Sequence, residues 1–167
     1  MQVGLDPASY LERLKHCLVE SFLAVFGQDL VSLVLFGSYA RGDYTAESDV
    51  DLLVVLEDFE DRFEVHRLLD RVEELSGPCL EGLRSLGYSP VLSPVVLSRS
   101  QASAIRPLYL DLVFDYEVLY DRGGFITSVL EGLKARLREY GAERRFIGRR
   151  WVVVLKKDLR FGEVVEL

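Results

Sequence analysis

Residues 35–55 read LFGSYARGDYTAESDVDLLVV. They connect two apolar runs, Leu30–Phe36 and Val50–Leu56, each of a length typical of a buried strand. A Gly-Ser pair ends the first run, and an Asp-Val-Asp triplet opens the second after a polar loop. The pattern predicts two core strands, with groups capable of chemistry where the chain leaves one strand and enters the other.

The Gly-Ser pair is Gly37 and Ser38. A glycine lets the backbone approach a ligand closely, and the N–H groups of the following turn can hold phosphate oxygens. The Ser38 hydroxyl adds one more donor. The plainer interpretation is an ordinary turn, and this pair alone would favour it.

The acidic triplet places Asp49 and Asp51 on one side of the second strand, because successive strand side chains point to opposite faces. Two carboxylates on one face repel each other, and a divalent cation relieves that repulsion. Oxygen ligands of this kind suit Mg²⁺. The plainer interpretation is a solvated strand start.

Together, at this spacing, the two features resemble the DNA polymerase β-type nucleotidyltransferase superfamily. Its signature is Gly-Ser, then Arg-Gly, then Ser-Asp-x-Asp-Leu after a short loop. The match is closest to the minimal nucleotidyltransferases of prokaryotes, and the resemblance implies an α/β (α+β) fold, a mixed β-sheet with helices packed on it. Every place of the signature is filled, by Gly37, Ser38, Arg41, Gly42, Ser48, Asp49, Asp51 and Leu52.

The resemblance also implies roles. Gly37 and Ser38 would contact the triphosphate of a nucleoside triphosphate, and Asp49 and Asp51 would be catalytic and would ligate Mg²⁺ bridging to phosphate oxygens. In the family's chemistry, two metals activate an acceptor hydroxyl and stabilise the leaving pyrophosphate.

Two further positions of the signature have two interpretations each. Arg41 would either contact phosphate or brace the loop through a carboxylate. Ser48 belongs to the nucleotide-binding set of the signature, and we favour a role in capping the turn and orienting Asp49.

The chain departs from the family where active members carry a third carboxylate on a later strand. By order that strand is Tyr88–Leu97, an edge strand or bulge by its prolines, and Ser93 and Pro94 stand where the carboxylate is expected. Asp111 is the best substitute if residues 110–114 form a strand. A helix starting at Pro107 is the favoured alternative, with Asp111 on a solvated face.

Helices are expected on both sides of this central segment in sequence. We expect these helices to pack on one side of the sheet, and we expect Gly37 and Asp49 to lie in a shared cleft. The chain is expected to form a single domain, 1–167, with a C-terminal helix and strand extension from about residue 122. The expected helices are a first one from Pro7 to Gly27, another over Glu60–Leu75 closed by Gly77-Pro78, a shorter one to Leu86, and one from Gly124 to Tyr140, followed by a hairpin over Arg145–Leu155.

Composition narrows the partners. The formal net charge of −7 opposes broad nucleic-acid binding through bulk charge, although a metal ion can offset acidity locally. No apolar run reaches the ~20 residues of a membrane span, the start lacks a secretory signal, and a cytoplasmic protein is expected.

Cys17 and Cys79 are expected to stay reduced and buried. The absence of Asn, with abundant charge, hints at a thermophilic source.

The remaining polar groups are weaker candidates. His16 and His66 are expected on helix surfaces. The basic cluster Arg144, Arg145, Arg149 and Arg150 is expected to be a solvated hairpin edge, with phosphate or RNA contact as the alternative.

Three hypotheses follow for function. The first is a Mg²⁺-dependent transferase that moves a nucleoside monophosphate to an acceptor hydroxyl. The second is a catalytically weak or inactive nucleotide-binding module, and the third is a subunit working with a helical partner protein or with copies of itself.

Overall fold

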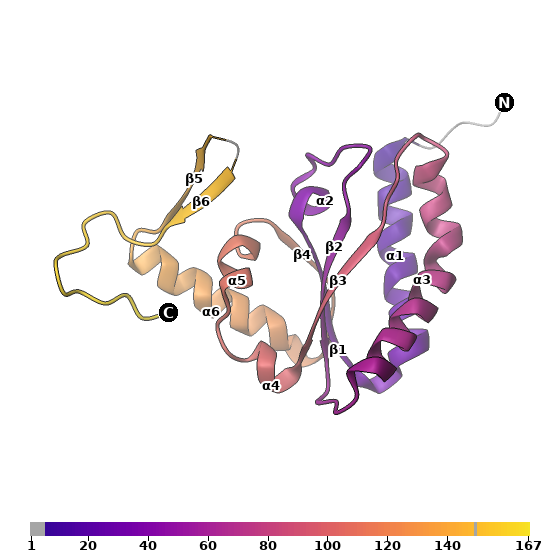
Figure 1. Cartoon of the computed structure of the whole chain (residues 1–167), viewed down its shortest axis with the longest axis horizontal. Helices are drawn as coiled ribbons and strands as arrows, with labels where there is room; N and C mark the ends of the chain where they lie inside the picture. The colour runs from indigo at the N-terminus through magenta and orange to yellow at the C-terminus, as the bar shows by residue number, and fades with distance from the viewer. Residues whose placement is uncertain (1–5, 149) are drawn as a thin grey trace.

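The computed structural model describes residues 6–148 and 150–167. Its centre is a four-stranded sheet in the order β3-β2-β1-β4 (Figure 1). The strands are β1 (Leu30–Phe36), β2 (Val50–Leu56), β3 (Leu92–Ser98) and β4 (Tyr116–Asp121). The helices are α1 (Pro7–Phe26), α2 (Gly37–Arg41), α3 (Arg62–Arg84), α4 (Arg99–Ala102), α5 (Pro107–Leu112) and α6 (Phe125–Glu139), with 3-10 turns η1 (Gly27–Asp29) and η2 (Arg122–Gly124).

The sheet is mixed, as expected. β1 runs antiparallel to β2 and to β4, and β2 runs parallel to β3. The two apolar runs of the sequence are the two central strands, with the predicted bounds. The strand that contains Pro94 lies at the sheet edge, where a missing backbone N–H costs no central pairing.

Helices cover both faces of the sheet, so the expectation of one covered side is wrong. α1 and α3 lie side by side on one face, and α4, α5 and α6 lie on the other (Figure 1). The reason lies in the central strands: Leu52 and Val54 enter the core under α1 and α3, whereas Leu53 and Val55 enter the core under α5 and α6. Strands that are apolar on both faces need cover on both.

The α1–α3 layer differs from expectation in two ways. α3 continues through Pro78 to Arg84 instead of ending before it, because Val72, Leu80 and Leu83 keep one buried face on both sides of the proline. Cys17 of α1 and Cys79 of α3 form a disulfide, so the expectation of two reduced thiols is wrong. The Asp6 side chain caps α1, accepting from the N–H of Ser9.

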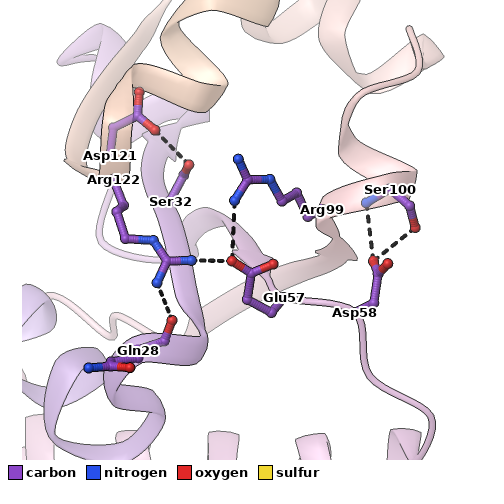
Figure 2. Close-up of polar contacts among 8 residues, drawn as sticks. All are labelled: Gln28, Ser32, Glu57, Asp58, Arg99, Ser100, Asp121 and Arg122. Carbon is purple, nitrogen blue, oxygen red and sulfur yellow. Dashed lines mark hydrogen bonds and ion pairs between the residues drawn. The ribbon is translucent and has the colours of Figure 1, made fainter.

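The sheet end away from the Gly-Ser turn is held by paired charges (Figure 2). Arg122 pairs with Glu57 and donates to the backbone carbonyl of Gln28, and Arg99 donates to the same Glu57 carboxylate over 3.2 Å. Asp121 accepts from the buried Ser32 hydroxyl over 2.7 Å. These contacts join the ends of β1, β2 and β4 to the starts of α4 and α6.

A two-stranded hairpin, β5 (Glu143–Ile147) and β6 (Arg150–Val154), follows α6 and confirms the predicted terminal hairpin. It stands apart from the main sheet, on the side of α5 and α6 (Figure 1). Arg149 of the basic cluster and the first residues of the chain lie outside the described residues. Within the described ranges, no helix has the length and apolar character that a membrane crossing requires.

Candidate active site

The Gly-Ser turn is the first turn of α2, and Gly37 lies directly against Asp51. Phe36, the last residue of β1, pairs with Asp51 in the antiparallel register. Gly37 has φ +71°, and a Cβ built on it would lie 2.2 Å from Asp51 Oδ2. Only glycine therefore lets the backbone turn here while the carboxylate stays beside it.

The acidic pair faces the α5 and α6 side of the sheet. Leu53 packs in the core on that side, and strand alternation places Asp51 and Asp49 on the same face. Burial, and then the negative charge of Asp49, raise the pKa of Asp51, while Arg41 acts in the opposite direction. The protein therefore holds two neighbouring carboxylates without enough positive charge to stabilise both.

This donor set fits a divalent cation. Two carboxylates share one face, partial burial and then the charge of Asp49 raise the pKa of Asp51, and the missing Cβ of Gly37 leaves room for the Asp51 carboxylate. Asp49 and Asp51 are the residues able to hold the ion.

The position beside Asp51 on the next strand holds a serine. In the parallel pairing of β2 with β3, Asp51 pairs with Ser93 and Leu52 with Pro94. This is the register position at which the sequence lacks a third carboxylate. Across residues 6–148 and 150–167, no three His, Cys, Asp or Glu side chains gather into a metal-binding group.

The loop between α2 and β2 is held by its own polar groups. Arg41 Nε donates to both carboxylate oxygens of Asp43 over 3.1 Å, a contact that braces the loop. Ser48 Oγ accepts from the Thr45 N–H over 2.8 Å, which is a turn-capping contact. These contacts match the structural interpretation of both residues.

Comparison with known proteins shows which family this chain belongs to. The nucleotidyltransferase domain family matches residues 16–166, nearly the whole chain. A candidate protein adenylyltransferase of Methanocaldococcus jannaschii is 34% identical over 129 residues, which cover 74% of this chain and 83% of the relative. The chain belongs to the nucleotidyltransferase domain family.

Other relatives of this nucleotidyltransferase are more distant. A second candidate protein adenylyltransferase of the same archaeon is 31% identical over 86 residues, covering 52% of this chain and 74% of the relative. A chain of a toxin–antitoxin crystal structure with AMP-PNP is 18% identical, with a TM-score of 0.46, over 76% of this chain and 92% of that one. Another, from a tri-AMPylated Shewanella oneidensis HEPN toxin in complex with MNT antitoxin, is 16% identical, with a TM-score of 0.45, over 78% and 92%.

An aromatic stack beneath the loop of the nucleotidyltransferase was not foreseen. The rings of Tyr39 and Tyr44 lie 4.3 Å apart at 7°, and Tyr88 packs against Tyr44. Burial, with smaller contributions from Tyr44, Tyr88 and Asp49, raises the pKa of Tyr39 to about 12. The stack keeps the loop before Asp49 packed on α2. Tyr39 and Tyr44 lie inside the signature, but nothing in the sequence shows that they meet Tyr88.

Asp111 lies on a helix, as the favoured interpretation had it, and it is exposed. It nevertheless lines a pocket of about 380 Å³ that also includes Gly37 and Arg41. The hairpin supplies the other wall, through Arg150 and Trp151. Nothing in the sequence indicates that Trp151 lies beside the signature.

The two histidines lie away from the acidic pair, whereas Arg144 and Arg150 of the basic cluster line the pocket that includes Gly37. His16 and His66 are exposed on α1 and α3, on the opposite face of the sheet. Of the basic cluster, Arg144 pairs with Asp115 and Arg145 pairs with Glu143. Much of that charge is therefore neutralised inside the hairpin and its base.

Proposed function

We propose that this nucleotidyltransferase binds a nucleoside triphosphate with Mg²⁺ at the Gly37 turn and the acidic pair, and transfers the nucleoside monophosphate to an acceptor hydroxyl. The observation that carries the proposal is the close approach of Gly37 to Asp51, a half-buried carboxylate with a raised pKa. A cation and a polyphosphate together supply what this arrangement lacks: positive charge for the carboxylates, and a ligand for the turn.

In the proposed reaction, the acceptor oxygen forms a bond to the α-phosphorus as the bond from that phosphorus to the β-phosphate oxygen breaks. Pyrophosphate leaves, and the acceptor loses its proton to a base. Bound Mg²⁺ would supply electrostatic stabilisation of the phosphate charge. The backbone N–H groups after Gly37 and the Ser38 hydroxyl would orient the phosphates, while Asp49 and Asp51 would hold the ion. Arg41 contacts Asp43 through Nε alone, so its two terminal amino groups could contact phosphate while the loop stays braced.

The acceptor that we propose is a hydroxyl on a protein, with ATP as donor. The relative that shares 34% identity over most of its length is named as a candidate protein adenylyltransferase, and this supports the choice. The formal net charge of −7 also argues against an extended nucleic-acid acceptor.

A second candidate is a nucleotide-binding module with slow or no transfer. Ser93, instead of a carboxylate, pairs with Asp51. Two metals need more anionic ligands than two aspartates supply, whereas one ion can be held by one or two carboxylates with phosphate oxygens and water. A helical partner protein that completes the site is the third possibility.

The test combines binding with transfer. Calorimetry with ATP and Mg²⁺ should show binding to the wild type that Asp49→Asn/Asp51→Asn loses. Glu47→Gln, an exposed carboxylate of the same loop, is the matched control and should bind normally. Transfer of label from α-labelled ATP to extract proteins then separates an enzyme from a binding module. Unchanged affinity in the double variant would refute the proposed site.

A further inference from the structure

The pocket between α2, α5 and the hairpin includes Gly37 and Arg41 of the signature in its lining. It has a volume of about 380 Å³, within the range of small-molecule sites. Its apolar wall includes Phe36, Leu108 and Trp151, and its polar wall includes Asp111 and Arg150. The pocket therefore offers flat apolar surface beside hydrogen-bonding groups.

The pocket is continuous with the proposed phosphate site. Gly37 and Arg41 line it, and Gly37 is the residue whose missing Cβ makes room for Asp51. Asp51 also faces the side of the sheet on which α5 lies. A nucleotide held by its phosphates at the Gly37 turn would have its nucleoside end beside this pocket.

The hairpin wall is positioned by one arginine. The Arg144 guanidinium lies 4.3 Å from the Trp151 ring centre and 5.1 Å from that of Phe114, and it pairs with Asp115 at the end of α5. Phe146 packs on Trp151 from the neighbouring strand, with ring centres 5.0 Å apart. Trp151 is thus held in place, yet 44% of its surface remains exposed.

We propose that this pocket binds the nucleoside half of the donor nucleotide. The base packs on the exposed surface of Trp151, and the Asp111 carboxylate accepts a hydrogen bond from a sugar hydroxyl or an exocyclic amine. Asp111 is exposed on α5 and lines the pocket, so its carboxylate oxygens are accessible to a ligand there. This inference rests on the proposed function, because the phosphates must lie at Gly37.

Trp151 is the single tryptophan of the chain, so its fluorescence reports on this pocket alone. ATP with Mg²⁺ should change its emission. Tripolyphosphate with Mg²⁺ should bind, as judged by calorimetry, and leave the emission nearly unchanged. ATP that binds in the calorimeter without altering Trp151 emission would overturn the nucleoside assignment and leave the phosphate site standing. Binding of neither ligand would refute the proposed function itself.

Two variants test the assignment without fluorescence. Trp151→Ala should weaken ATP binding by roughly tenfold, because base stacking on an aromatic ring is lost, while tripolyphosphate binding is kept. Asp111→Asn should weaken ATP binding severalfold, again without affecting tripolyphosphate.

Each variant has a matched control outside the pocket. Val152→Ala alters the opposite face of β6, and Asp158→Asn removes an exposed carboxylate of the C-terminal tail. Both should bind ATP as the wild type does. Equal losses for ATP and tripolyphosphate in Trp151→Ala or Asp111→Asn would contradict the proposal. Unchanged ATP affinity in both pocket variants would contradict it too. Thermal melts close to the wild type would show that a loss of ATP affinity does not come from a folding defect.

Discussion

The two ends of the central sheet treat their carboxylates in opposite ways. At the end shown in Figure 2, Asp121 accepts from Ser32, Thr127 and Ile126. Burial opposes ionisation there, but those hydrogen bonds together keep the pKa of Asp121 below its usual value. At the other end, burial and Asp49 raise the pKa of Asp51. The sheet therefore carries a carboxylate whose ionised form is stabilised at one end, and a carboxylate whose ionised form is destabilised at the other.

The difference distinguishes charged side chains that are paired within the protein from the acidic pair, which we propose binds a ligand. Glu57 is paired with both Arg99 and Arg122, which makes that end self-sufficient. Near the acidic pair, the nearest arginine is instead engaged with Asp43. A protein stabilises such an arrangement poorly on its own, and perturbed carboxylates of this kind are a feature of functional sites.

The largest effect is expected from Gly37→Ala. The new Cβ would meet Asp51 Oδ2 at 2.2 Å, in a backbone conformation with φ +71°. Strain and overpacking together should lower the free energy of unfolding by about 2–4 kcal/mol and abolish ATP binding. Thermal melts and calorimetry measure both.

Gly42→Ala is the matched control for that change. Gly42 has φ +81°, but a Cβ there would meet nothing within 4 Å. It should cost about 1–2 kcal/mol through backbone strain alone and leave ATP binding measurable. Similar losses of binding in the two variants would show that the Gly37–Asp51 contact has no special role.

A smaller effect is expected at the satisfied end. Asp121→Asn removes the charge that four donors from three residues stabilise, while the amide oxygen can still take the place of one carboxylate oxygen. Because this carboxylate is partly exposed, we expect a loss of about 1 kcal/mol in unfolding free energy by urea titration. ATP affinity should not change, since Asp121 lies at the other end of β4. A stabilised variant would contradict the comparison.

The same substitution at the other end should have the opposite sign. Asp51→Asn removes a half-buried charge that repels Asp49, so without ligand the variant should melt roughly 1–3 °C higher than the wild type. It should gain little from added ATP and Mg²⁺, because the ligand stabilises only a protein that binds it. A lower melting temperature for the ligand-free variant would mean that Asp51 is satisfied after all.

The smallest expected effect is the pH dependence of that gain. Asp51 has a folded pKa above its ordinary 3.8, so its contribution to stability improves as the pH falls through the raised pKa. The advantage of Asp51→Asn over the wild type should therefore shrink between pH 7 and about pH 4. Asp121 behaves inversely: its depressed pKa gives stability that is present above 3.8 and is lost as the pH falls below it. Melts of Asp51→Asn between pH 7 and about pH 4, and melts of Asp121→Asn continued below pH 3.8, measure the two trends.

Local patterns predicted much of this molecule. The central strands have the predicted bounds, because an apolar run between turns needs no distant information. The signature also predicts that the Gly-Ser turn approaches the acidic pair, since it joins the end of one strand to the start of the strand paired with it. The expected neighbours are Gly37 and Asp49, whereas the contact in the structure joins Gly37 and Asp51. The edge position of the proline-containing strand followed from the missing N–H of Pro94.

The remaining features depend on contacts between distant segments. Cys17 and Cys79 are 62 residues apart, and no spacing rule reveals that α1 and α3 bring them together. Gly77-Pro78 locally favours a helix end, but burial of the residues on both sides outweighs the cost of a proline inside the helix. Trp151 reaches the Gly37 pocket only because the hairpin folds back beside α5. The second helical layer was predictable in principle, because the central strands are apolar on both faces.

The disulfide between Cys17 and Cys79 has a consequence for cleavage of the chain. The covalent loop that it closes contains β1, α2 and β2, and hence Gly37, Asp49 and Asp51. A single protease cut after Arg41 would leave two pieces tethered until a reductant is added, whereas a cut after Lys157 in the C-terminal tail would release its fragment at once. Electrophoresis with and without reductant would therefore distinguish a cut within the signature from one in the tail.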